Sequence, residues 1–255
     1  MTLNVDYAGG AGAAPNGGGT GSQALDIVDV VAAGRGREAV TVPLVPLLAY
    51  PGVVAAHGVA GMDEADLAVG ARIALWVQSF LMRPHADLGR LGDVCPFTSQ
   101  AAKIGTARIG VWNGGPDAEA ILALMEAAVR AFDRMPCPKG MAQFKTIIIG
   151  FPNCTDEAGL KVLKQTQDKL EPHSVFRGKM IGFFRPDAPD QGLINPNFRP
   201  MQSPVPLLAI RLMVEGDAPF VVRHRRLTPI YLAKFPRTAL QRLFTAARRG
   251  DNALS

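Results

Sequence analysis

The sequence has 255 residues, of which 48% are hydrophobic and 19% are charged, with a formal net charge of +5. A chain of this length and apolar content can bury a sizeable core as one large domain, so two compact domains are not required. The modest positive charge argues against nucleic acid as the default partner, and no helix-turn-helix or ribonucleoprotein signature accompanies it.

The first part of the chain is rich in glycine and poor in large apolar residues. The stretch from Gly9 to Gly21 contains only Gly, Ala, Asn, Pro and Thr, a composition that cannot bury enough apolar area to offset the entropy of ordering. We therefore expect residues 1–22 to be disordered and residues 23–255 to form a single domain. Met1 to Tyr7 includes Asp6 and lacks a basic start followed by an apolar core, so we expect no secretory signal and a cytoplasmic protein.

An apolar stretch follows, from Val40 to Val59, which prolines and Gly52 interrupt. These breaks argue against a membrane-spanning helix. They predict an irregular segment within residues 23–62 that packs against a core formed by residues 63–250.

Helices and strands then alternate along the chain. Acidic residues at 63, 64 and 66 and helical apolar spacing predict a helix that ends before Pro84, and residues 85–93 form a loop with two glycines. Residues 106–112 are typical of a strand, and Asp117 begins a helix with apolar residues at i, i+3, i+4 and i+7. Three consecutive isoleucines predict a strand at 144–151 that is buried on both faces. Thr155 precedes another helix.

The remaining third predicts a strand at 179–184, a proline-rich segment at 185–206 that is too long for a simple connection, and a helix from Tyr231 to Arg249. We interpret residues 185–206 as a lid. Alternation at 207–214 followed by Phe220 to Val222 predicts a β-hairpin, with an amphipathic helix as the alternative. The whole pattern indicates an α/β fold, with a mixed sheet of about four to five strands covered by helices.

The loop that joins the first helix to the first core strand carries unusual chemistry. Residues 84–97 read PHADLGRLGDVCPF, which brings a histidine, two aspartates, an arginine and a cysteine into one glycine-bearing loop. Cys95 fits a buried structural cysteine, a haem or metal ligand, or a nucleophile that His85 activates by lowering the thiol pKa. For His85, a loop residue that caps the carbonyls of the preceding helix is favoured over a catalytic or ligand role.

Basic residues dominate the C-terminal end. Arg211 is the one charge in a long apolar run, so it needs a carboxylate such as Asp217 or Asp93, or an anionic ligand. His224 lies between Arg223 and Arg225, where a histidine ligand flanked by cations would suit a haem and its propionates. A solvated basic surface is the alternative, and an acidic carrier protein is a further candidate partner.

Other common sites are absent from the sequence. The cysteines at 95, 137 and 154 are widely spaced and form no C-x-x-C pair, so neither a disulfide framework nor a zinc site is supported. No Walker loop, dinucleotide-binding glycine motif, zincin motif or nucleophile elbow occurs.

Over residues 76–235 the chain resembles an uncharacterised bacterial family of domains of unknown function that is often seen beside natural-product biosynthesis genes. The resemblance rests on Trp76 with Phe80-Leu81, the run from Pro84 to Phe97, Met180-Ile181-Gly182, the run SPVPLLAIR at 203–211, and Tyr231 with Phe235. It implies no activity.

A more distant likeness is to small haem-dependent enzymes that N-hydroxylate guanidine-bearing amino acids. Cys95-Pro96-Phe97, the run from Gly216 to Val222 and His224 occupy the corresponding places. This resemblance implies a haem cofactor, with His224 or His85 as the axial ligand and Cys95 as the alternative. Arg211, Arg223 and Arg225 would then bind the propionates or a substrate carboxylate.

Three functional hypotheses follow. The first is a haem-dependent, oxygen-activating enzyme of specialised metabolism with a small amino-acid-like substrate. The second is a cysteine-dependent acyltransferase or hydrolase that uses Cys95 and His85 on carrier-bound intermediates. The third is a non-catalytic binding module of a biosynthetic cluster. None of them requires nucleic acid or a membrane.

Overall fold

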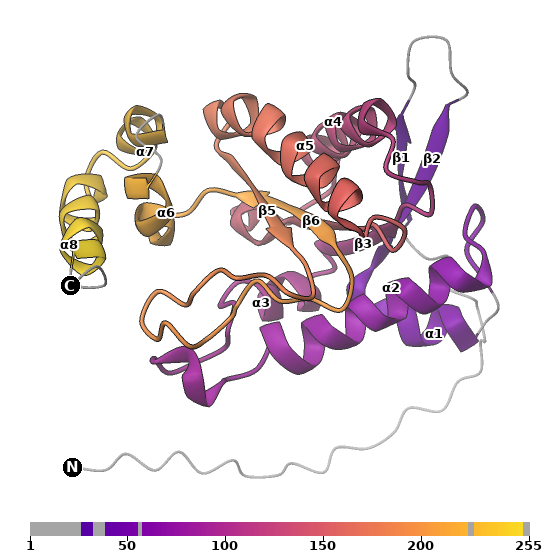
Figure 1. Ribbon diagram of the computed structural model, residues 1–255, viewed down its shortest axis with the longest axis horizontal. Coiled ribbons are helices and arrows are strands. Elements are labelled where there is room, and N and C mark those ends of the chain that lie inside the picture. The colour runs from indigo at the N-terminus through magenta and orange to yellow at the C-terminus, as the bar shows by residue number, and fades with distance from the viewer. Residues whose placement is uncertain (1–26, 33–38, 56–57, 224–226, 252–255) are drawn as a thin grey trace.

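A mixed six-stranded sheet forms the centre of the molecule (Figure 1). The computed structural model describes residues 27–32, 39–55, 58–223 and 227–251. The strands are β1 (Val28–Ala32), β2 (Val40–Pro46), β3 (Ala107–Val111), β4 (Thr146–Gly150), β5 (Lys179–Phe184) and β6 (Leu207–Leu212), in the spatial order β1-β2-β3-β4-β6-β5. Strands β3 and β4 are parallel, and the other neighbouring pairs are antiparallel. The α/β prediction with a mixed sheet is confirmed.

Helices cover both faces of this sheet. Figure 1 shows α4 (Ala118–Arg134) and α5 (Glu157–Phe176) on one face, and α1 (Tyr50–Ala55), α2 (Glu64–Trp76) and α3 (Thr98–Lys103) on the other. The isoleucines of β4 alternate between the two layers, because Ile147 and Ile149 pack with α4 and α5 whereas Ile148 packs with α2. The prediction that this strand is buried on both faces is confirmed.

Aspartate side chains begin the helices α2, α4 and α5. Asp63 accepts a hydrogen bond from the Asp66 amide, Asp117 from the Glu119 and Ala120 amides, and Asp156 from the Gly159 amide. Each carboxylate satisfies amides that have no partner within the helix and places negative charge at its positive end. These starts agree with the sequence predictions to within a residue or two.

The prediction of an irregular segment from Val40 to Val59 is wrong for its first half. Residues 40–46 form β2, which pairs with β1 along its length and with β3 at Val45 and Pro46. The strands that pair with β2 lie before and after it in the sequence. The prolines within residues 40–46 therefore could not by themselves predict this strand.

The predicted hairpin after residue 207 is also wrong in its second half. β6 ends at Leu212, and Phe220 to Val222 lie in α6 (Ala218–Arg223), so the helical alternative holds there. Pro219 explains the difference, because a proline in the first turn of a helix lacks only an N–H that would have no helical partner. The predicted C-terminal helix is divided at Pro236 into α7 (Thr228–Lys234) and α8 (Ala239–Asp251).

The last three helices form a small cluster of their own beyond β5 and β6 (Figure 1). Tyr231, Val221 and Met213 are among its buried residues. Within the described ranges, no helix combines the length and the apolar character needed to cross a membrane. The predicted disorder of residues 1–22 lies outside the described residues.

Candidate functional site

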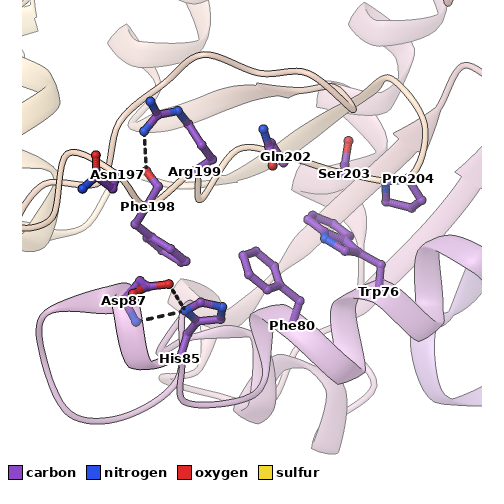
Figure 2. A pocket seen from close by; sticks show the side chains of 10 residues that line it. All are labelled: Trp76, Phe80, His85, Asp87, Asn197, Phe198, Arg199, Gln202, Ser203 and Pro204. Carbon is purple, nitrogen blue, oxygen red and sulfur yellow. Dashed lines mark hydrogen bonds and ion pairs between the residues drawn. The ribbon is translucent and has the colours of Figure 1, made fainter.

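An open groove of about 500 Å³ lies between the C-terminal end of α2 and the segment 185–206 (Figure 2). Its position is beside the end of β5, since Phe184, the last residue of that strand, packs edge-on against Trp76 with ring centroids 5.8 Å apart. The lining residues are Trp76, Phe80, His85, Asp87, Asn197, Phe198, Arg199, Gln202, Ser203 and Pro204.

One wall is built by a π-helical segment, Val77–Leu81, that continues α2. The amide of Met82 donates to the carbonyl of Val77 at 2.9 Å, five residues back. Such wide turns are rare and are frequent at functional sites. Here the segment presents Phe80 next to Trp76, with ring centroids 6.2 Å apart and planes 25° from parallel.

The opposite wall is the segment 185–206, which has the irregular backbone that its prolines predicted. Phe198 is 5% exposed and points across the groove, with its ring centroid 4.9 Å from that of His85 and 5.9 Å from that of Phe80. The Gly192 amide donates to the Phe198 carbonyl at 2.8 Å, which holds the loop around this side chain. Phe198 therefore meets the opposite side of the groove through contacts between rings.

His85 lies on the floor of the groove with one nitrogen occupied. Its Nδ1 accepts a hydrogen bond from the Asp87 amide at 3.1 Å, and the Asp87 carboxylate lies 3.8 Å from the same nitrogen. A backbone N–H can only donate, so Nδ1 carries a lone pair and the neutral ring carries its proton on Nε2. No described residue accepts a hydrogen bond from Nε2, and 39% of the side chain is exposed. Contrary to the sequence prediction, His85 does not cap the preceding helix; it caps the turn at 86–88 that follows it.

The polar residues of the opposite wall are only partly used by the protein. Arg199 donates to the carbonyls of Pro196 and Phe198, and the hydroxyl of Ser203 donates to the Val205 carbonyl. The Gln202 amide is 3.5 Å from the Ala188 carbonyl, a distance too long for a strong hydrogen bond. Amide and hydroxyl oxygens of this wall thus retain capacity for a ligand.

Cys95 packs against the core and not into the groove. The Cys95 amide donates to the Leu81 carbonyl at 2.9 Å, and the side chain packs against the core beneath α2 and α3. No hydrogen bond joins Cys95 to His85, although both are described, and Cys95 does not line the groove. The pairing required for a cysteine nucleophile activated by His85 is absent in this arrangement.

Arg211 pairs with a carboxylate, as its apolar surroundings in the sequence predicted. Its guanidinium donates to both oxygens of Asp217, at 2.8 and 2.5 Å, and the Asp217 side chain is 3% exposed. Burial alone lowers the pKa of Arg211, but the hydrogen bonds and charge of Asp217, with a smaller contribution from Cys95, raise the pKa above its ordinary value. The charge is thus engaged in a structural ion pair, one of the two roles that the sequence allowed.

Of the predicted haem ligands, the structure describes His85 and Cys95. His224 and Arg225 lie outside the described residues, and Arg223 ends α6 with a side chain outside them. His85 presents an N–H at Nε2 while Nδ1 accepts from an amide, whereas an iron ligand needs a free lone pair. The described residues therefore do not fit a haem site, and the haem prediction depends on His224. In the described part of the chain, no three His, Cys, Asp or Glu side chains gather as a metal site.

Three residues that line the groove were not predicted to be functional from the sequence. Trp76 and Phe80 were identified only as motif residues of a family resemblance, and Phe198 was not identified. Two aromatic residues at spacing i and i+4, next to the Pro84-His85 break, were the available signal, since such a pair lies on one face at the end of a helix.

Comparison with known proteins agrees with the first resemblance. The profile of a family described as Domain of unknown function (DUF6875) matches residues 70–245. This range contains every lining residue of the groove. No curated protein and no solved structure matches the chain significantly.

Proposed function

We propose that the chain, which belongs to the family Domain of unknown function (DUF6875), binds a small planar organic molecule as its substrate in the groove between α2 and residues 185–206. The proposal keeps the small-molecule substrate expected from the sequence. It takes its chemistry from the groove and requires neither a haem nor a cysteine nucleophile.

The observation that carries the proposal is the meeting of three aromatic rings around one open space. Trp76 and Phe80 come from the end of α2, and Phe198 comes from a loop more than a hundred residues later (Figure 2). Aromatic rings attract flat apolar surfaces through their large contact area and their stacking preferences. A volume of about 500 Å³ lies within the range of small-molecule sites.

Polar groups around the rings would orient such a ligand. His85 offers a donor, and Asn197, Gln202 and Ser203 offer oxygens with remaining acceptor capacity. A few placed polar groups on a mainly apolar surface are typical of sites that bind one orientation of a ligand.

Tryptophan fluorescence tests the proposal, because the chain has two tryptophans in different surroundings. Trp112 is 8% exposed and donates to the Gly115 carbonyl, so a Trp112→Phe variant leaves Trp76 as the reporter of the groove. We expect a saturable change in its emission on titration with toluene, benzamide or benzylammonium.

A matched pair of variants assigns that signal to the groove. Phe80→Ala removes a ring from the lining and should weaken binding by roughly fivefold, about 1 kcal/mol. Leu75→Ala changes an exposed residue of α2 that does not line the groove, and should leave the affinity unchanged. Absence of a saturable change with all three probes, or equal affinities in Phe80→Ala and Leu75→Ala, would contradict the proposal.

A further inference from the structure

We infer that the ligand presents a carbonyl-type oxygen to His85, whose Nε2–H is the donor that recognises it. This inference rests on the proposed function and narrows its substrate class to planar molecules that carry a hydrogen-bond acceptor. It concerns one atom of the groove and a ligand chemistry that neither the family description nor the sequence assigns.

The backbone fixes which nitrogen of His85 faces the ligand. His85 precedes the short helical turn Ala86–Leu88 in an extended conformation, and its Nδ1 accepts from the Asp87 amide at 3.1 Å. Figure 2 shows Nδ1 turned toward Asp87 and the other ring nitrogen turned toward Phe80. The hydrogen bond therefore directs Nε2 away from its own loop and into the groove.

This nitrogen carries a hydrogen in both protonation states of the ring. In the neutral ring, the bond from the Asp87 amide leaves the proton on Nε2. In the charged ring, both nitrogens are protonated, and the Asp87 carboxylate at 3.8 Å is placed to accept from Nδ1. Nε2 is thus a donor throughout, and an acceptor on the ligand is its natural complement.

The surroundings of the ring hold this donor in place without satisfying it. The Phe80 ring lies 5.8 Å from the imidazole between centroids, with the two planes 75° apart, and the Phe198 ring lies 4.9 Å from it. Neither ring can accept a conventional hydrogen bond, and no described residue does so. A ligand that binds this donor pays little side-chain ordering entropy, because the rotamer of His85 is already fixed by its neighbours.

The three probes of the fluorescence titration separate this inference from the proposed function. Benzamide carries a carbonyl oxygen on a flat ring, toluene has the ring alone, and benzylammonium has a donor in place of the acceptor. We expect benzamide to bind the Trp112→Phe protein about 3- to 10-fold more tightly than toluene, the range of one net hydrogen bond, and benzylammonium to gain nothing over toluene.

Two substitutions of His85 separate the roles of its two ring nitrogens. In His85→Asn, the amide oxygen lies where Nδ1 was and keeps the bond from the Asp87 amide, but the Nε2 donor is lost. In His85→Gln, the longer side chain places an N–H near the position of Nε2, while the cap is weakened. Recognition through Nε2 predicts that His85→Asn loses the preference for benzamide over toluene and that His85→Gln retains it.

A merely structural role of His85 gives the opposite order, since Asn is the better cap and Gln the poorer one. Thermal unfolding of both variants reports that structural contribution separately from binding. The inference is overturned if toluene binds the Trp112→Phe protein as tightly as benzamide, or if His85→Asn keeps the preference; binding of toluene would still support the proposed function. Failure of all three probes to bind overturns both.

Discussion

At the scale of single residues, Asp66 shows how burial changes a carboxylate that the sequence presents as an ordinary helix-start residue. Its side chain is 5% exposed in the first turn of α2, and Asn113 donates to it at 3.1 Å. Burial, and then the charge of Asp63, raise the pKa of Asp66 above 3.8, although a backbone hydrogen bond opposes the shift. Ionisation of Asp66 therefore costs folding free energy.

The sign of this effect gives a prediction for pH. Because the pKa is raised in the folded chain, the contribution to stability is fully present below the unfolded value of 3.8 and is lost as the pH rises through the folded value. An Asp66→Asn variant should thus gain stability relative to the wild type as the pH rises from 4 to 7, measured by urea unfolding. Glu64→Gln changes an exposed carboxylate of the same helical turn and is measured in parallel as the matched control. A flat profile for Asp66→Asn would contradict the assignment.

At the scale of elements, α2 connects the core to the groove, and its close packing against Tyr50 sets its position. Tyr50 is fully buried and donates to the Ile109 carbonyl of β3 at 3.0 Å. A Cβ atom at Gly70 would overlap the Tyr50 ring, so glycine is required there for contact and not for helix formation. The position of Trp76 and Phe80 depends on this contact, because they lie further along the same helix.

Two glycine substitutions test that packing. Gly70→Ala should destabilise the fold by about 1–3 kcal/mol through overpacking, although alanine favours helices. Gly52→Ala is the matched control in α1, since nothing lies within 4 Å of the added Cβ, and should stabilise the fold by about 0.5–1 kcal/mol. Denaturant unfolding measures both changes, and a stabilised Gly70→Ala variant would show that α2 is not held by Tyr50.

The same scale shows what could be predicted from the sequence. The aspartates before α2, α4 and α5 and the apolar runs of β3, β4 and β5 are local signals, and these elements were predicted close to their observed bounds. β2 was missed because its strand pairing comes from β1 and β3, which local composition does not describe. α6 was taken for a strand because Phe220 to Val222 favour strands by composition, while Pro219 and the turn at Glu215–Asp217 set a helix.

At the scale of the whole molecule, the groove could not be predicted, because it forms only when α2, the loop after it and residues 185–206 meet. His85 was identified for its chemistry and does line the groove, whereas Cys95 and Arg211 pack elsewhere, close enough for the thiol to affect the Arg211 pKa. The polar chemistry of the loop correctly indicated that His85 lines a groove. The same reasoning was wrong for Cys95, because its side chain packs against the core.

The haem prediction can be decided at this scale by a spectrum of the purified protein. His85 offers no lone pair toward the groove, so we expect the spectrum obtained on titration with haemin to be the same in the wild type and in His85→Ala. A saturable Soret band shift that is lost in His224→Ala would assign the ligand to the segment after α6. A shift lost in His85→Ala would contradict the hydrogen-bond assignment of its ring nitrogens.

The central claim is tested most directly by a crystal structure of the chain with bound benzamide. The account predicts density for the flat ring among Trp76, Phe80 and Phe198, with the carbonyl oxygen within about 3 Å of His85 Nε2. Benzamide bound elsewhere on the molecule, with the groove filled only by solvent, would contradict it.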